Sequence, residues 1–181
     1  MIELGNNSDH SRWAEKATIA LALVRCHQGQ TEEAQSLIIT IEQKIQESSS
    51  PVYAERFAYF IQIMGQVYVA LHQYSKAQTL FERAIAYAIE GHYAQIQGLA
   101  LNGMAMIYRQ QDDFEKAIAL HQEAVQLLEK IGASCDLAHV YSQWSQTLKG
   151  MGRLSQKHHQ HAIDLFEKIP APQQIKRLGS S

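Results

Sequence analysis

The stretch Leu101–Ile131, LNGMAMIYRQQDDFEKAIALHQEAVQLLEKI, decides the fold of this 181-residue chain. Its first half carries Leu101, Met104 and Tyr108 at helical spacing, and its second half has a similar apolar pattern. The polar residues 110–113, QQDD, separate the two halves. We therefore predict two amphipathic helices that fold back on each other. One such hairpin cannot bury its own apolar faces, so it needs neighbouring hairpins.

The same pattern occurs earlier in the chain, beginning at Ile61. The shift pairs Leu101 with Ile61, Ala105 with Gly65, Tyr108 with Tyr68, Ala117 with Ala77 and Ala124 with Ala84. The internal spacing is also kept, because Gly65 and Ala77 are as far apart in the chain as Ala105 and Ala117. A fixed period of this kind predicts an array of repeated hairpins.

Gly65-x-x-Tyr68, Ala77-x-x-x-Phe81 and the following Ala84 resemble the tetratricopeptide repeat (TPR). Ile61 and Leu101 stand in place of the usual Trp, and the closing Pro is absent. The 40-residue period exceeds the usual ~34 residues, which is similar to the long repeats of kinesin light chains and many bacterial signalling proteins. The resemblance extends over residues 12–169 and implies an all-α fold, a right-handed α-solenoid of about four helix hairpins.

The hairpins are expected at residues 11–47, 51–90, 92–131 and 134–169. The first helix is expected to begin near Arg12, after a flexible N-terminus at residues 1–10. Residues 170–181 are expected to form a tail or a short capping turn. The fourth hairpin departs from the register, because Ser145 and Ala162 are closer together than the matching pair Ala105 and Ala124. Its second helix is expected to include Leu154.

Composition narrows the function classes. The chain is 46% hydrophobic and 19% charged, which is enough for one soluble domain with a continuous core. With a net charge of -2, the chain has no excess of basic residues that would indicate nucleic-acid binding. It also lacks the long apolar run that would predict a membrane span. The start MIELGNNSDH lacks the features of a signal peptide. Two cysteines are too few for a disulfide framework, so we expect a cytoplasmic protein.

In TPR folds the first helix of each hairpin lines a concave groove, so the resemblance implies a binding surface on those helices. The candidate groove residues are Tyr59, Gln62, Gln66, Asn102, Met106, Arg109, Ser142, Gln146 and Lys149. Side-chain amides pair with the backbone N–H and C=O groups of a bound peptide. The alternative is that these polar residues form only a solvated helix face.

His158 and His161 are the one cluster that suggests metal chemistry, since i and i+3 share a helix face. A zinc site needs further protein ligands, and the sequence has no HExxH motif. The alternative is an exposed face of the last helix. His121 occupies the position of the repeat's second aromatic residue, which favours a packing role. Nucleotide-binding, esterase and paired-cysteine motifs are also missing, so we predict no enzyme and no cofactor.

The predicted function is a protein–protein interaction module that binds a peptide or partner segment in the groove. The expected setting is a scaffold or regulatory part of a bacterial-type signalling or transcription-control system. One alternative is a regulatory sensor that changes conformation on binding a ligand or peptide. A more remote alternative is a metal-binding protein that uses His158 and His161. The sequence leaves the identity of the partner and the oligomeric state open.

Overall fold

The computed structural model describes residues 4–47 and 54–168, which form eight α-helices and no strand. The helices are α1 (Leu4–His27), α2 (Thr31–Glu47), α3 (Ala54–Ala70), α4 (Tyr74–Glu90), α5 (Ala94–Gln110), α6 (Phe114–Lys130), α7 (Ser134–Gly150) and α8 (Gln156–Glu167). We call α1, α3, α5 and α7 the first helices and α2, α4, α6 and α8 the second helices. No described helix is long and apolar enough to cross a membrane.

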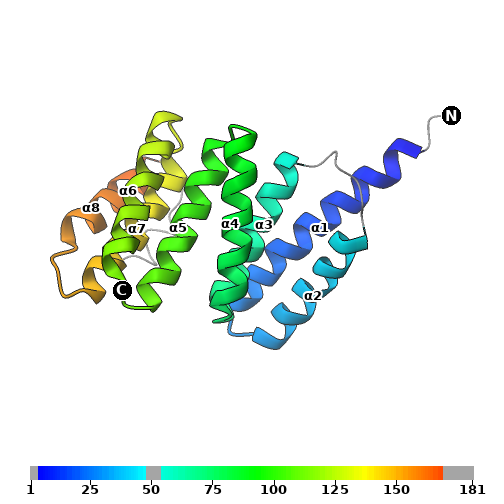
Figure 1. The fold of residues 1–181 in the computed structure, drawn as a ribbon, viewed down its shortest axis with the longest axis horizontal. Helices are drawn as coiled ribbons and strands as arrows, with labels where there is room; N and C mark the ends of the chain where they lie inside the picture. The colour runs from blue at the N-terminus through cyan, green and yellow to red at the C-terminus, as the bar shows by residue number, and fades with distance from the viewer. Residues whose placement is uncertain (1–3, 48–53, 169–181) are drawn as a thin grey trace.

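Four antiparallel hairpins stack side by side along the chain (Figure 1). Within each hairpin the first helix packs against the second, and each of α4 and α6 also packs against the following first helix. The first helices α1, α3, α5 and α7 contact one another in sequence. The predicted all-α solenoid of four hairpins is therefore confirmed.

Phe81 of α4 shows why the helices can approach so closely. A Cβ added to Gly65 of α3 would lie 2.6 Å from the Phe81 ring, and one added to Gly103 of α5 would lie 2.3 Å from it. Both distances are too short for real carbon contacts, so glycine at these positions lets Phe81 fill the space between α3 and α5. The sequence pattern had singled out Gly65, whereas Gly103 became visible only through this packing.

The turns between successive helices also repeat, both within and between hairpins. His72, His92 and Asp112 adopt left-handed backbone φ angles of 58°, 57° and 60°, and Gly132 has φ 68° at the corresponding place in the next turn. Asp113 caps α6, because its carboxylate accepts a hydrogen bond of 3.3 Å from the backbone N–H of Lys116.

Two expected helix starts are corrected by the structure. Helix α1 begins at Leu4 rather than near Arg12, so most of the segment expected to be a flexible N-terminus is helical. Helix α8 begins at Gln156, and Leu154 precedes it with 94% of its surface exposed. The gap between the first two expected hairpins, residues 48–50, and the tail at 170–181 lie outside the described residues.

The register change in the fourth hairpin has a visible packing consequence. In the third hairpin Gly98 meets Leu128, and in the fourth Ala138 packs with Ala162 and Phe166. Ala138 follows Gly98 by one full period, whereas Phe166 follows Leu128 by two positions less than a period. The loop before α8 therefore absorbs the difference, and the helix contact itself is kept.

Candidate functional site

The nine candidate groove residues lie on three neighbouring first helices, α3, α5 and α7. Their 40-residue spacing arranges six of them in two rows that cross these helices. The lower row is Gln62, Asn102 and Ser142, and the upper row is Gln66, Met106 and Gln146. The two rows differ in how much of each side chain reaches solvent.

The lower row is buried, which corrects the expectation that these residues form an accessible surface. Gln62 and Asn102 are each 1% exposed and Ser142 is 8% exposed. We attribute the burial to the direct packing of α3, α5 and α7, which removes solvent from positions near their contacts. The amide nitrogen of Gln62 and the side-chain carbonyl oxygen of Asn102 have no hydrogen-bond partner among the described residues. Unpaired buried polar groups of this kind each cost about 1–3 kcal/mol.

The upper row reaches solvent. Gln66 and Met106 are half-buried, and Gln146 is exposed. Lys149 is exposed at the end of α7, and Tyr59 is half-buried near the start of α3. The Tyr59 ring lies 4.9 Å from the ammonium group of Lys16 on α1. A partner that approaches α3, α5 and α7 would therefore meet the upper row before the lower one.

Arg109 connects two hairpins and is only partly a surface residue. Its Nη1 donates hydrogen bonds to the backbone oxygen of Gln143 at 3.1 Å and to the Gln143 side-chain oxygen at 3.2 Å. Burial lowers the pKa of the guanidinium group. Arg109 therefore helps to join α5 to α7, a role that the sequence pattern alone did not reveal.

His139 and Leu99 are two further residues of this region that sequence reasoning missed. Leu99 follows Tyr59 by one period and His139 follows it by two, so the same shift that paired the other positions would have identified them. The side chain of His139 reaches solvent, yet the surrounding protein desolvates it and lowers its pKa. Asp136 opposes this shift, and repulsion from His27 of α1 adds to it.

An aromatic cluster joins α6, α7 and α8. The rings of His121 and Trp144 are stacked at 6.1 Å, and Trp144 lies 4.3 Å from His158. Tyr141 lies 4.4 Å from His161 in an edge-to-face arrangement. His158 and His161, the pair considered for a metal, thus pack against aromatic rings. Among the described residues, no group of three or more His, Cys, Asp or Glu side chains is placed to hold a metal ion.

His121 packs in the interior, as its aromatic position in the repeat favours, but it is fully buried where a half-buried side chain was expected. Its Nε2 lies 3.0 Å from the hydroxyl of Thr147, and that hydroxyl donates to the backbone oxygen of Gln143 at 3.1 Å. Since the hydroxyl proton is used, we assign the His121 proton to Nε2, which leaves Nδ1 as an unpaired acceptor. Burial, with repulsion from Arg109, His158 and His139, lowers the pKa of His121 to about 3.

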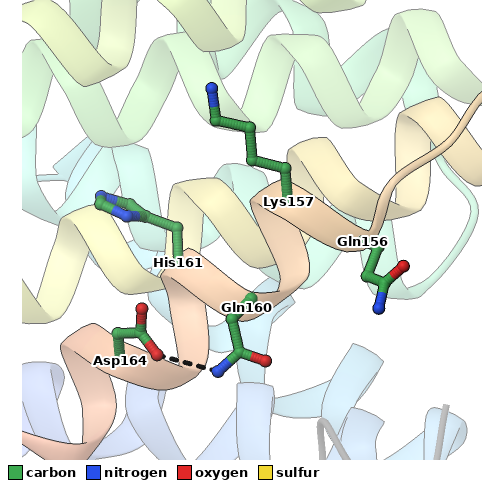
Figure 2. Close-up of a pocket in the computed structure, with 5 residues that line it drawn as sticks. All are labelled: Gln156, Lys157, Gln160, His161 and Asp164. Atoms are coloured by element: carbon green, nitrogen blue, oxygen red, sulfur yellow. Dashed lines mark hydrogen bonds between the residues drawn. The ribbon is translucent and has the colours of Figure 1, made fainter.

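One surface hollow of about 470 Å³ lies along α8 (Figure 2). The described residues that line it are Gln156, Lys157, Gln160, His161 and Asp164. Asp164 accepts a hydrogen bond of 2.8 Å from the amide of Gln160, which occupies part of its hydrogen-bonding capacity. These five side chains all come from a single helix, so within residues 4–47 and 54–168 they form an open polar face and not an enclosed ligand site.

Comparisons with known proteins agree with this geometry. The tetratricopeptide repeat family model matches residues 55–130 and 96–169. No curated protein sequence matches the chain. Among solved structures, BtubC (BKLC) from P. vanneervenii is similar with a TM-score of 0.62 and 21% identity, over 83% of this chain and 62% of that one.

Aspartyl phosphate phosphatase F from Bacillus subtilis is similar with a TM-score of 0.69 and 16% identity, over 93% of this chain and 45% of that one. The chain thus spans less than two thirds of either solved relative, and at these identities the likeness concerns the fold. The family match covers more than half of the chain, and it coincides with the hairpins built around Gly65, Phe81 and Gly103. The chain therefore belongs to the tetratricopeptide repeat family of protein-interaction modules.

Proposed function

We propose that this chain binds a segment of a partner protein across α3, α5 and α7, in a scaffolding or regulatory role inside a bacterial-type cell. The observation that carries the proposal is the upper row, in which Gln66, Met106 and Gln146 reach solvent on three adjacent helices. Stacked repeats create extended surfaces that suit an elongated partner. The fold is similar to that of an aspartyl phosphate phosphatase, and no catalytic role is proposed from that likeness.

The chemistry of the surface suggests what kind of segment binds. The Gln66 and Gln146 amides offer both donors and acceptors, which match the backbone of an extended or helical peptide. Met106 lies between them and offers an adaptable apolar contact. Lys149 adds positive charge at the end of α7. We therefore propose a segment with one central apolar side chain and an acidic residue toward the α7 end.

The unpaired lower row gives further support. Gln62 lacks a partner for a donor and Asn102 lacks one for an acceptor, and both lie one helical turn before an upper-row residue on the same helix. Movement of the half-buried Gln66 and Met106 side chains on binding would bring partner backbone groups toward these two amides. Such pairing would recover part of the free energy that the unpaired groups cost in the free protein.

The first experiment maps the surface. A photo-reactive amino acid is placed at position 66, 106 or 146 in the full chain, and matched variants carry it at Glu82 and Glu123, which are exposed on second helices. We expect the three upper-row positions to cross-link the same partner protein in cells and the two control positions to leave it uncaptured. Equal capture from the controls would contradict the proposed face.

The second experiment measures affinity once that partner segment is known. In titration calorimetry, the double variant Gln66→Ala, Gln146→Ala is expected to lose about 1–2 kcal/mol of binding free energy. The control pair Glu82→Ala, Glu123→Ala should bind as the parent does. Variants at Asn102 and Arg109 are less suitable, because Asn102 is buried and Arg109 joins α5 to α7. Unchanged affinity in the upper-row variant would refute the site.

A further inference from the structure

His139 lies on the same side of α7 as Gln146, and both side chains are exposed. The two residues are two helical turns apart, or about 10 Å along the helix axis. Leu99 and Tyr59 precede His139 by one and two periods, and both are half-buried. We call Tyr59, Leu99 and His139 the His139 row. It crosses α3, α5 and α7 as the upper row does, so a segment bound between the two rows can contact both.

The charges on these three helices favour an acidic partner. In residues 58–70, 94–110 and 134–150 the charged side chains are Asp136, Arg109 and Lys149. Asp136 is already engaged, because its carboxylate accepts a hydrogen bond of 2.7 Å from the amide of Gln95. Surfaces with an excess of positive charge attract acidic partners and suppress basic ones. The described part of this surface is therefore complementary to an acidic segment.

The surroundings of His139 favour its neutral form in the free protein. Desolvation lowers the pKa of the imidazole, which is the largest effect. Asp136, one turn earlier on α7, partly offsets this effect, and repulsion from His27 at the end of α1 adds to it. The pKa of His139 therefore lies below its ordinary value of 6.5, although the side chain remains open to an approaching partner.

The titratable groups of the neighbouring helices contact other parts of α7. They include Arg109 of α5, His121 and Glu129 of α6, and His158 and His161 of α8. Glu129 accepts a hydrogen bond of 3.3 Å from Tyr141, and the two α8 histidines pack against Tyr141 and Trp144. Tyr141 and Trp144 follow His139 by two and five positions, which places them on other sides of the helix. Among the described residues, the carboxylate that acts on His139 is therefore that of Asp136.

A carboxylate from a bound partner would change this balance. It would approach His139 from solvent, attract the imidazolium form and offset the repulsion from His27. We propose that His139 binds an acidic side chain of the partner segment and takes up a proton from solution when it does so. This inference rests on the proposed function, because it needs a segment that crosses α3, α5 and α7.

The affinity for the segment then depends on pH in a defined direction. A partner carboxylate raises the pKa of His139 in the complex above its value in the free protein, so the complex binds the proton more readily. Affinity therefore increases as the pH is lowered through the range between these two pKa values. Because the pKa in the free protein lies below 6.5, we expect the increase between about pH 8 and about pH 6.

Titration calorimetry of the full chain tests this direction. The probe is a synthetic peptide of the segment that is captured from positions 66, 106 and 146. We expect binding about fivefold tighter at pH 6 than at pH 8, with uptake of about half a proton per complex near pH 7. Proton uptake is measured by repeating the titration in buffers of different ionisation enthalpy. His139→Gln should remove both effects, whereas His159→Gln on α8 is the matched control and should keep them.

A second set of peptides identifies the paired group. Each acidic residue of the peptide is replaced in turn by its amide. For one of these peptides we expect the pH dependence to disappear with the parent chain and His139→Gln to cause no further loss. Nuclear magnetic resonance of the His139 ring should show a higher pKa with the unmodified peptide than without it. Because the side chain is exposed, circular dichroism should show a folded His139 variant.

The outcomes separate this inference from the proposed function. Binding that is lost in the Gln66→Ala, Gln146→Ala variant but has equal affinity at pH 6 and pH 8 in the parent would refute the role of His139 alone. A pH dependence that survives His139→Gln would assign it to another histidine, such as His27, and would also overturn the inference. Failure of the three upper-row positions to capture a common partner would refute the proposed function and this inference together.

Discussion

The second and third hairpins share one backbone plan but fill the same interior position with different side chains. Phe81 of α4 and His121 of α6 lie one period apart, and both are fully buried. Phe81 is flanked by Gly65 and Gly103. The positions equivalent to these glycines in the next repeat hold Ala105 and Gln143, which leave less room for a ring. The smaller imidazole of His121 takes the place of the phenyl ring there.

The side chain at a repeat position therefore depends on the space that its neighbours leave. At Phe81 the space is apolar, so burial of the ring stabilises the fold through the hydrophobic effect alone. At His121 the space contains a hydroxyl from Thr147 and the charge of Arg109 nearby, so the same position also carries a protonation equilibrium. Changes at Phe81, Gly103, His121 and Gln73 should therefore affect stability to different extents.

The largest expected effect is the loss of Phe81. Phe81→Ala should lower the free energy of unfolding by about 3–5 kcal/mol, because it leaves a cavity between α3 and α5. Urea denaturation followed by circular dichroism measures the change. Leu120→Ala, at a half-buried position of α6, serves as the control and should lose less. Equal losses for the two variants would contradict the central role of Phe81.

Adding one methyl group beside Phe81 should have the next largest effect. Gly103→Ala should cost about 1–3 kcal/mol, because the new Cβ would overlap the phenyl ring. Gly150→Ala is the matched control, since its Cβ would meet only the edge of Phe114 at 3.1 Å. Adding Phe81→Leu to Gly103→Ala should cost less than the sum of the two single changes. Strict additivity would show that the two residues do not share the space.

Acid should destabilise the protein through His121. Its folded pKa of about 3 lies below the ordinary value of 6.5, so between these pH values the unfolded chain binds a proton that the folded chain does not. The contribution of neutral His121 to the free energy of unfolding is therefore fully present above pH 6.5. Between pH 6.5 and about 3 it falls as the pH is lowered, by up to about 1.4 kcal/mol per pH unit. Urea denaturation at a series of pH values measures the slope.

The matched variant for this slope is His121→Leu, which keeps a similar volume and cannot bind a proton. Thr147 still donates to Gln143 in that variant, so it leaves no unpaired hydroxyl proton. We expect a shallower slope below pH 6.5 than in the parent. The surrounding protein also desolvates His139 and His158 and lowers their pKa values, so part of the slope should remain. An unchanged slope would exclude His121 as the main source.

The smallest expected effect concerns the helix caps. Gln73 precedes α4 with φ -94° and ψ 65°, close to the φ -84° and ψ 66° of Asp113 before α6, but its side chain makes no capping hydrogen bond. Helix α4 starts at Tyr74, so Ser75 lies inside the helix and Gln73 holds the N-cap position. Gln73→Asp should therefore stabilise the protein by about 0.5–1 kcal/mol. Gln73→Asn should give a similar gain in thermal melting, whereas Gln73→Ala should give none.

Much of the site could be located from the sequence, but its accessibility could not. The 40-residue period assigned Gln62, Gln66, Asn102 and Met106 to the first helices, and the structure has them there. The same period could not predict that Gln62 is buried while Gln66 reaches solvent. Both residues lie on α3, and the burial of each depends on how closely α5 approaches α3 at that position. The contact between Arg109 and Gln143 also joins residues 34 positions apart, which no local pattern reveals.

The hairpin plan follows from the sequence alone, since local helical spacing and the repeated Gly-x-x-Tyr and Ala-x-x-x-Phe pattern act within about one repeat. The use of Gly103 and the burial of Gln62 and Asn102 depend on the tertiary structure. These features depend on which side of a helix its neighbour covers. That choice is made by packing between repeats, where the space left by one side chain fixes what the next can occupy.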